Sequence, residues 1–294
     1  MVVVTEENFV VMDVYQNIVK LRTTLEAQRT NGQRIALVAT MGNLHEGHLA
    51  LIRLAKQRAD IVVASIFVNP LQFGLNENWE QYPRTFDEDC AKLISEGCDY
   101  LLHPDEREMY PNGMAEQTRV FCSTMTDVWC GASRPGHFEG VTTVVTKLLN
   151  IVQPNIAVFG EKDWQQLAVI RRMAADLCVS IEVIGAPVAR DTDGLALSSR
   201  NRFLTKQERS KANLLYETML GMAKAIATGD RDYLKLQKQA GERIEAAKFR
   251  LDYLAVVHAE DLEPATAVDK DLRILGAIYA SNTRLIDNIG VQPV

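Results

Sequence analysis

His45 and His48 lie three positions apart in the stretch ATMGNLHEGHLALIRLAK, residues 39 to 56, with Gly42 before them and Gly47 between them. Imidazole rings handle protons and donate hydrogen bonds near neutral pH, and glycine lets the backbone approach an anion closely. A strand that ends at residues 39–40 and a helix that begins near Gly47 would put the pair at a helix N-terminus, where unpaired N–H groups favour a phosphate. The stretch therefore predicts a site that binds phosphate and stabilises charge building on it.

Two other interpretations compete for the histidine pair. Helical zinc peptidases space their histidines at i and i+4 with a glutamate next to the first, whereas His45 and His48 are spaced i and i+3 across Gly47. This spacing argues against zinc. The other alternative makes both histidines ordinary polar residues at a helix start, but it leaves the neighbouring glycines without a reason.

The surrounding pattern predicts the elements that would position such a site. Short β-branched runs alternate with longer helical patterns, and apolar strands such as IVVASIFV suit a parallel sheet covered on both faces. We therefore expect an α/β fold with a Rossmann-like, doubly wound parallel sheet, which binds ligands at the carboxyl ends of its strands. The expected strands are 34–39, 61–68, 100–103, 156–160 and 180–185, and the expected helices are 47–58, 86–96, 140–151 and 164–177.

The composition changes after the stretch GAPVARDTDG, which predicts a domain boundary near residue 187. We expect a larger domain over residues 1–186 and a second, smaller α+β domain over residues 187–294 that closes over the site. Thr205 and Glu208 have capping-box spacing and precede apolar residues at helical spacing up to Gly229. A further helix over 233–249 and three antiparallel strands over 251–259, 272–280 and 283–290 are expected to complete this domain.

Composition also narrows the class of protein. The 32 basic and 38 acidic residues give a net charge of −6 without a long block of one sign, so attraction to nucleic acid is not expected. The longest apolar stretch, 61–68, is far shorter than the roughly 20 residues that cross a bilayer, and the first 15 residues lack the pattern of a secretory signal. Five cysteines without CxxC spacing predict reduced, buried thiols. We expect a cytoplasmic protein without membrane or nucleic-acid partners.

The letters HEGH at residues 45–48 match the HxGH signature of the nucleotidylyl-transferase superfamily, but four letters alone are a weak signal. MGNLHEGH (41–48), SIFVNPLQFG (65–74), FGEKDWQQLAVIRRM (159–173) and GLALSSRNRFL (194–204) together resemble one family in it, the pantoate–β-alanine ligases. QYPRTFDED (81–89) and RPGHFEGVTTVVTKLLN (134–150) agree with this resemblance. It covers about residues 34–204, with RLIDNI (284–289) as a looser match.

The resemblance implies an ATP-dependent ligation that also uses Mg²⁺. The carboxylate of pantoate attacks the α-phosphorus of ATP to give pantoyl adenylate and pyrophosphate, and the amine of β-alanine then displaces AMP to form pantothenate. Because the substrate itself is the nucleophile, positioning and charge stabilisation must carry the catalysis. The family similarity also implies a homodimer formed through the N-terminal domain.

On the matched motifs, the resemblance assigns catalytic roles to His45, His48 and Lys162, with His48 as the proton donor. Gln72 and Gln166 are the expected substrate-binding residues because a neutral amide suits the hydroxyls and carboxylate of pantoate. The expected ATP-binding residues are Met41, Gly42, Asn43, Leu44, His45, Glu46, Gly47, His48, Gly160, Glu161, Lys162, Asp163, Ala189, Leu197, Ser198, Ser199 and Arg200.

Two of these groups have a structural alternative. Asp163 could bond the ribose of ATP, or it could only cap the helix that follows. Ser198, Ser199 and Arg200 could grip the departing pyrophosphate on a mobile loop, or they could form an ordinary turn. Gln165 should point about 100° away from Gln166 around the helix, so it is not expected to bind substrate.

Other polar residues near the motifs have no assigned role. Arg134 and His137 lie in a loop that is expected to border the pocket, and whether they act directly is open. Asp87, Glu88 and Asp89 could hold Mg²⁺, which binds substrate phosphates and few carboxylates. Acidic residues at a helix start also complement the helix dipole. The metal ligands therefore stay unknown.

The HEGH stretch alone is compatible with two other functions. One is a nucleotidyl transferase that stops after moving a nucleotide to a phosphate or alcohol, and the other is a nucleotide sensor without catalysis. Gln72, Gln166 and the extra C-terminal domain favour the ligase over the transferase. The intact set of His45, His48 and Lys162 argues against the sensor.

Overall fold

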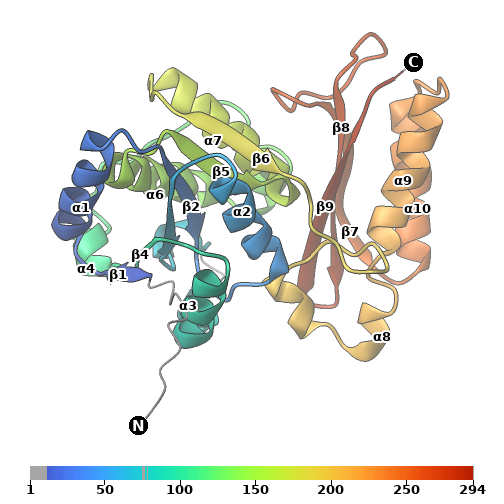
Figure 1. Ribbon diagram of the computed structural model, residues 1–294. Coiled ribbons are helices and arrows are strands. Elements are labelled where there is room, and N and C mark those ends of the chain that lie inside the picture. The colour runs from blue at the N-terminus through green and yellow to red at the C-terminus, as the bar shows by residue number, and fades with distance from the viewer. Residues whose placement is uncertain (1–11, 75–76, 78, 294) are drawn as a thin grey trace.

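The computed structural model describes residues 12–74, 77 and 79–293, which form two sheets (Figure 1). The larger sheet has six parallel strands in the order β1-β4-β3-β2-β5-β6. Its strand order reverses between β2 and β5, which is the switch point where ligands bind in such sheets. The strands are β1 (Asp13–Tyr15), β2 (Ile35–Thr40), β3 (Ile61–Ile66), β4 (Tyr100–Leu102), β5 (Ile156–Gly160) and β6 (Glu182–Ala186).

Helices cover both faces of this sheet. Along β2, Ala36 and Val38 belong to a core shared with α2 and α3, whereas Ile35 and Leu37 belong to a core shared with α1, α6 and α7. Alternate residues of one strand thus face opposite helical layers, and the expected Rossmann-like, doubly wound fold is confirmed. The helices are α1 (Ile18–Thr30), α2 (Glu46–Lys56), α3 (Phe86–Ser95), α4 (Glu106–Met109), α5 (Cys130–Ser133), α6 (His137–Val152) and α7 (Trp164–Asp176).

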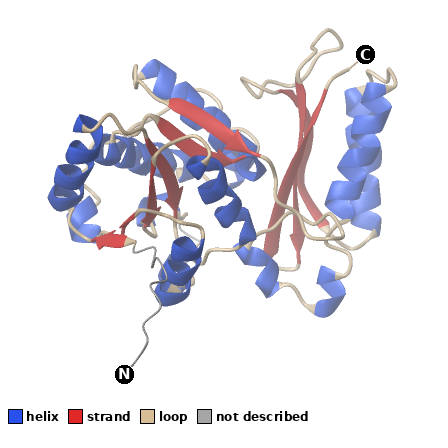
Figure 2. Ribbon diagram, in the orientation of Figure 1, coloured by secondary structure: helices blue, strands red, loops and turns tan. Residues whose placement is uncertain are grey.

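The smaller domain contains an antiparallel sheet of β7 (Arg250–His258), β8 (Leu272–Ala280) and β9 (Thr283–Val291). Helices α9 (Leu214–Ala227) and α10 (Tyr233–Ala246) cover one face of it, as Figure 2 shows. On the other face, Ala255, Val257 and Leu275 form a separate apolar cluster with Ala168 of α7. This sheet therefore joins its own helices to the larger domain.

Most expected elements are present with ends shifted by a few residues. The sequence analysis did not predict β1, α1, α4 and α5, and α1 offers a weak pattern because it buries only Leu21 and Leu25. The helix expected from residue 140 begins at His137. The capping box of Thr205 and Glu208 is present, but it starts a single turn, α8 (Lys206–Arg209), that is separate from α9.

The five cysteines and the longest apolar stretch, 61–68, lie within the described residues. All five thiols are free, and Cys98, Cys122 and Cys130 are buried as predicted. Cys90 is half-buried and Cys178 is exposed at the end of α7, so the burial prediction is wrong for Cys178. Among the described residues, no helix has the length and apolar character needed to cross a membrane. The stretch used to judge a secretory signal lies, up to residue 11, outside the described residues.

Candidate active site

A cavity of about 250 Å³ opens at the carboxyl ends of β2 and β5, where the strand order reverses. Its walls come from the turn between β2 and α2, the segments after β3 and β5, helix α6 and the chain after β6. Most of the sequence-predicted site residues lie together here. They are Met41, His45, Gly47, His48, Gln72, Gly160, Lys162, Asp163, Gln166, Ala189, Leu197, Ser198, Ser199 and Arg200.

The two histidines cap helix α2. His45 is the N-cap residue, and its Nδ1 accepts a hydrogen bond from the N–H of Gly47 at 3.1 Å. The Nδ1 of His48 accepts a hydrogen bond from the N–H of His45 at 3.3 Å. Because each neutral ring uses Nδ1 as an acceptor, its proton is on Nε2. Each ring therefore keeps one Nε2–H donor for the cavity that both residues line.

Glycines make this arrangement possible. A Cβ atom on Gly47 would lie 2.9 Å from Cε1 of His45, so any other residue would displace the ring. Gly42 has φ of +82° and Asn43 has φ of 51°, which turns the chain between β2 and α2. Gly47 thus serves the His45 ring directly, in addition to any close approach of an anion.

Asp89 at the start of α3 anchors the same turn. Its buried carboxylate accepts hydrogen bonds from the N–H groups of Asn43 at 2.8 Å and Leu44 at 2.7 Å, and from the hydroxyl of Thr85 at 3.1 Å. The N–H groups of Asn43 and Leu44 are therefore already bonded. Asp89 orients the HEGH turn from behind and does not line the cavity.

Some expected ATP-binding residues do not reach the cavity, namely Gly42, Asn43, Leu44, Glu46 and Glu161. Leu44 packs into the core between the sheet and α2. Glu46 is exposed and pairs with Arg53 on the outer face of α2. Glu161 turns toward the smaller domain and pairs with Arg273 at 3.4 Å. A contiguous sequence motif includes such residues because neighbouring side chains point in different directions.

Burial makes both histidines of the motif neutral. Desolvation, with the positive charge of Lys162 nearby, lowers the pKa of His45 to about 4. Desolvation, with the neighbouring His45 ring, lowers the pKa of His48 to about 3. Near neutral pH both rings are therefore uncharged, and each has one Nε2–H available to donate.

Lys162 and Asp163 follow β5 in a short 3₁₀ turn, η3 (Glu161–Asp163), and both line the cavity. Asp163 makes no side-chain hydrogen bond to the start of α7, so the helix-cap alternative for this residue is wrong. Desolvation raises the pKa of the Asp163 carboxyl, but the charges of Lys162 and Arg200 outweigh it and hold the pKa below its ordinary value. The carboxylate therefore stays ionised among cations.

Gln72 lies in a second 3₁₀ turn, η1 (Pro70–Gln72), that is held tightly against α6. A Cβ atom on Gly140 would lie 2.2 Å from the carbonyl oxygen of Leu71, so only glycine permits this contact. Asn69, which is buried, donates to the Gly140 carbonyl oxygen at 3.0 Å and accepts from the Tyr110 hydroxyl at 2.7 Å. These contacts fix the segment that carries the Gln72 side chain into the cavity.

Arg134 and His137 border the cavity and are linked to Gln72. The guanidinium of Arg134 makes two 2.6 Å hydrogen bonds to Glu77 and donates to Nε2 of His137 at 2.9 Å. The Nδ1–H of His137 donates to the Gln72 carbonyl oxygen at 2.8 Å. Desolvation and the charge of Arg134 lower the pKa of His137 to about 4. No pattern in the sequence indicated that Glu77 completes this chain of contacts.

Gln166 lines the cavity, whereas Gln165 points away from it as expected. The buried Gln165 side chain accepts from the N–H of Cys130 at 2.9 Å and donates to the carbonyl oxygens of Met125 at 2.7 Å and Val128 at 2.9 Å. Its role is to hold the chain before α5.

One wall of the cavity is apolar, and the sequence analysis did not identify it. Val141, Val144, Val145 and Leu148 recur at helical spacing along α6 and face the cavity. This periodicity predicts a buried face, but it does not tell a cavity wall from a packed core. The sequence analysis also missed other lining residues, including Thr40, Phe67, Phe73, Tyr82, Phe159, Pro187 and Val188.

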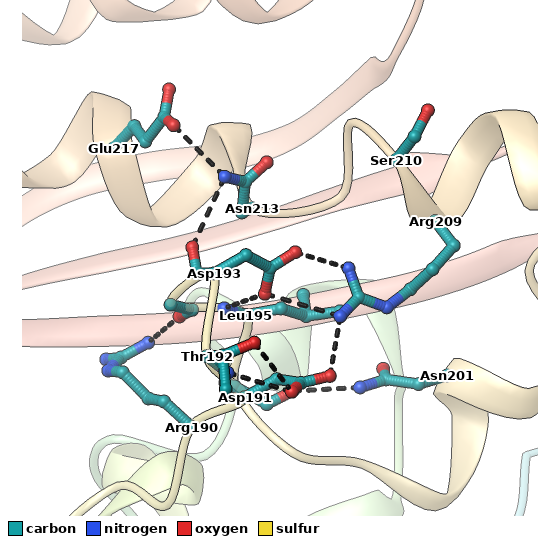
Figure 3. A network of polar contacts seen from close by, with 12 residues as sticks. Arg190, Asp191, Thr192, Asp193, Leu195, Asn201, Arg209, Ser210, Asn213 and Glu217 are labelled. Carbon is teal, nitrogen blue, oxygen red and sulfur yellow. Dashed lines mark hydrogen bonds and ion pairs between the residues drawn. The ribbon is translucent and has the colours of Figure 1, made fainter.

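The segment that leads into Ser198–Arg200 is fixed by a polar network (Figure 3). Arg209 donates to the carboxylates of Asp191 at 2.6 Å and Asp193 at 2.5 Å across a tight turn. The N–H of Gly194 closes the turn on the Asp191 carbonyl oxygen at 2.9 Å. Ser198 caps a 3₁₀ turn, η4 (Ser199–Phe203), by accepting the Arg200 N–H at 3.2 Å. The segment is thus an ordered turn that also lines the cavity.

Fold and site together define a class of protein. A doubly wound parallel sheet whose switch point carries a helix N-terminus, two imidazole donors, an ammonium and a guanidinium is typical of α/β enzymes that act on phosphorylated, nucleotide-like ligands. A family model described as pantoate-beta-alanine ligase matches residues 13–290. The chain belongs to the pantoate–β-alanine ligase family, enzymes that condense pantoate with β-alanine to pantothenate.

Individual relatives agree over nearly the whole length. The chain is 56% identical over 280 residues to a pantothenate synthetase from Cellvibrio japonicus, covering 95% of this chain and 99% of the relative. The crystal structure of pantothenate synthetase from Thermus thermophilus matches with 44% identity and a TM-score of 0.89, covering 96% and 100%. Pantoate-beta-alanine ligase from Francisella tularensis, complexed with Beta-gamma ATP and Beta-alanine, matches with 34% identity and a TM-score of 0.79, covering 95% and 97%. The ligase interpretation of the sequence is confirmed.

Proposed function

We propose that the enzyme uses ATP to join pantoate to β-alanine through a pantoyl adenylate, with release of pyrophosphate and AMP. The observation that carries this proposal is a single cavity whose lining combines two chemically different sets of side chains. His45, His48 and Lys162 suit a triphosphate, and the neutral amides of Gln72 and Gln166 line the same cavity. The ligands named for the Francisella relative support ATP and β-alanine as ligands of this chain.

ATP would bind with its phosphates at the N-terminus of α2. The Nε2–H groups of His45 and His48 would donate to phosphate oxygens, and the Lys162 ammonium would neutralise charge from across the cavity. His48 is our candidate for the proton donor. Bound phosphates would raise the pKa of His48 because negative charge favours the imidazolium form. Its proton would then stabilise the α-phosphate as the carboxylate attacks.

The rest of the nucleotide would contact the residues around this centre. Gly160 and Asp163 are candidates for the ribose, and the ionised Asp163 can accept from ribose hydroxyls. Ser198, Ser199 and Arg200 would hold the departing pyrophosphate with two hydroxyls and a guanidinium. Met41, Gly47, Ala189 and Leu197 line the same cavity and would complete the nucleotide site.

Pantoate would bind next to the two glutamines. Gln72 and Gln166 supply donors and acceptors for its hydroxyls and carboxylate without adding a charge. The apolar wall formed by Val141, Val144 and Val145 suits the two methyl groups of pantoate. In this pose the carboxylate oxygen bonds to the α-phosphorus as the bond to pyrophosphate breaks. The amine of β-alanine then bonds to the acyl carbon as AMP leaves.

Mg²⁺ would enter with ATP. It prefers phosphate and water oxygens with one or two carboxylates, and the described residues contain no cluster of three or more His, Cys, Asp or Glu that could hold it alone. Asp163 is the acidic residue among the described residues that line the cavity. Asp87 and Glu88 are exposed outside the cavity lining and Asp89 is bonded to the backbone, so these candidates do not fit. Bound Mg²⁺ would neutralise phosphate charge.

Several features of the whole protein are also proposals. We place the domain boundary after Ala186, where β6 ends, because the core of α9, α10 and the antiparallel sheet is separate from the cores of the larger sheet. The smaller domain would close over the site. Five free thiols favour a reducing compartment, which supports a cytoplasmic location. The homodimer rests on the family resemblance.

Release of pyrophosphate and AMP tests the proposed reaction. With ATP, pyrophosphate should form when pantoate is added and before β-alanine is present. AMP and the amide should form only when both acids are supplied. Pyrophosphate without amide in the complete mixture would favour a nucleotidyl transferase, and ATP binding without pyrophosphate would favour a sensor.

A further inference from the structure

Asn288 on β9 of the smaller domain holds the backbone that carries Lys162. Its Nδ2 donates to the carbonyl oxygen of Glu161 at 2.7 Å and to that of Lys162 at 3.0 Å. Asn288 is only 2% exposed. It does not line the main cavity and instead borders a narrow pocket between the domains. Its contact with the reaction centre is therefore indirect.

The turn η3 is held from outside at its carbonyl oxygens, and no side chain caps its N–H end. Gly160, the residue before η3, has no side chain to cap it, and Asp163 makes no side-chain cap to α7. The lysine side chain is long and flexible, so the place of its ammonium depends on the backbone that bears it. The two carbonyl oxygens that Asn288 bonds belong to Glu161 and Lys162, so the bonds fix the backbone from which the lysine side chain extends.

The neighbouring Asp287 holds a second cationic segment of the cavity, the one that carries Arg200. Its carboxylate pairs in bidentate fashion with Arg190 at 2.6 Å and 2.9 Å, and it is 6% exposed. Arg190 also donates to the Gly194 carbonyl oxygen at 3.1 Å, in the turn that leads to Ser198. The Asp287 carboxylate also accepts the N–H of Asn288 at 2.7 Å, so the two holds are connected.

We infer that Asn288 is a positioning residue for Lys162 and that, with Asp287, it sets the place of the segments that carry Lys162 and Arg200 from the smaller domain. This inference rests on the proposed role of Lys162 at the ATP phosphates. A shift of about 1 Å in a positioned group can cost on the order of a hundredfold in rate. Loss of the Asn288 hold should therefore slow adenylate formation more than it weakens ATP binding.

The test replaces Asn288 by leucine, which is of comparable size and has no donor. In Asn288→Leu, the rate constant for pyrophosphate formation from ATP and pantoate should fall on the order of tenfold to a hundredfold. The KM for ATP should change much less. In the Lys162→Ala background the same substitution should cause no further loss, because the residue it positions is gone.

Gln237→Met is the matched control. The Gln237 side chain accepts the N–H of Val256 at 2.8 Å within the smaller domain, away from η3. The Gln237→Met variant therefore loses one hydrogen bond from a side chain to the backbone of the same domain. This loss should lower the melting temperature without slowing pyrophosphate formation. If Asn288→Leu does not fold, Asn288→Ser, which keeps one hydroxyl donor, should show a smaller fall in the same rate constant.

The outcomes separate the inference from the proposed function. A wild-type rate in Lys162→Ala would remove the proposed role of Lys162 and the inference with it. A slow Lys162→Ala enzyme combined with an unaffected Asn288 variant would overturn the inference alone. The inference would also be overturned if the Asn288 substitution slowed pyrophosphate formation by the same factor in the wild-type and Lys162→Ala backgrounds. The same holds if Gln237→Met slowed it as much as Asn288→Leu. Either result would indicate general destabilisation.

Discussion

The backbone N–H of His45 donates to Nδ1 of His48, and the two ring centres lie 4.1 Å apart. With the bond from the Gly47 N–H to His45, this is a reciprocal cap of helix α2 in the manner of a capping box. A capping box joins residues three positions apart, which explains the i, i+3 spacing of the pair. The structural and catalytic interpretations of these histidines are therefore compatible, since capping uses Nδ1 and leaves Nε2–H.

The cap predicts how the two roles of His48 separate. In His48→Ala, we expect adenylate formation to fall by about 10²–10³-fold through loss of a charge-stabilising donor. Stability should fall by about 1 kcal/mol because the N–H of His45 loses its acceptor on His48. Isotope exchange between pyrophosphate and ATP in the presence of pantoate measures the first effect, and urea unfolding measures the second. ATP affinity measured by calorimetry should change little.

His48→Gln is the control for this prediction. Glutamine is common at this position of a capping box and can accept the same backbone bond. It should restore most of the stability without restoring exchange. Exchange at the wild-type rate in His48→Gln would contradict a catalytic role for the imidazole.

The positions of Gln72 and Gln166 in the cavity predict where pantoate binds. Replacement of either by alanine should raise the KM for pantoate by about three- to tenfold, because a hydrogen bond contributes about 0.5–1.5 kcal/mol. ATP binding should be nearly unchanged. Initial rates of pyrophosphate release at varied pantoate concentration provide the measurement.

Gln165→Ala is the matched control because the residue is adjacent in sequence but buried and bonded to backbone. It should lower the melting temperature and leave the KM for pantoate unchanged. A raised KM in this variant, or a loss of ATP binding in Gln72→Ala, would refute the assignment of the glutamines.

Replacement of Asp89 should cause a structural defect that added Mg²⁺ does not correct. In Asp89→Asn, the N–H groups of Asn43 and Leu44 lose a charged acceptor, so stability should fall by about 1.5–3 kcal/mol. Adenylate formation should slow because the HEGH turn is less fixed. Asp87→Asn removes the same charge from an exposed position in the same helical turn and should have no such effect. Restoration of the Asp89→Asn rate by raised Mg²⁺ would show that the carboxylate is a metal ligand after all.

Much of the fold could be predicted from the sequence because the apolar strands and the longer helices carry strong periodicity. Strands such as Ile61–Ile66 are buried throughout and read as one apolar run. Helix α1 buries only two side chains, so its pattern is weak. The capping box at Thr205 predicts where a helix begins, but not that α8 ends at Arg209 and a separate helix, α9, begins at Leu214.

The site was predicted where motifs follow the carboxyl ends of neighbouring strands, as His45 and His48 follow β2 and Lys162 follows β5. Motif letters do not give side-chain direction, which is why Leu44, Glu46 and Glu161 were included although they face elsewhere. Contacts between distant segments left no local signal in the sequence. The bond of Asn288 to η3 joins residues 126 positions apart, and no spacing rule predicts such a pair.

The lowered histidine pKa values predict how stability depends on pH. The pKa is about 4 for His45 and about 3 for His48 in the folded protein, against an ordinary value near 6.5 in the unfolded chain. Between these values the unfolded state binds more protons than the folded state. The free energy of unfolding is therefore highest above pH 6.5 with respect to these groups and falls as the pH falls through this window.

Urea unfolding between about pH 7 and pH 5 measures this slope with little contribution from most carboxylates, whose ordinary pKa values are near 4. His48→Gln retains a cap but cannot take up a proton, so its stability should fall less steeply over this range than that of the wild type. The replacement thus costs little stability near neutral pH and becomes relatively more favourable in mild acid. Parallel slopes for the two proteins would mean that His48 titrates normally in the folded state, and the Nε2–H assignment would then lose its support.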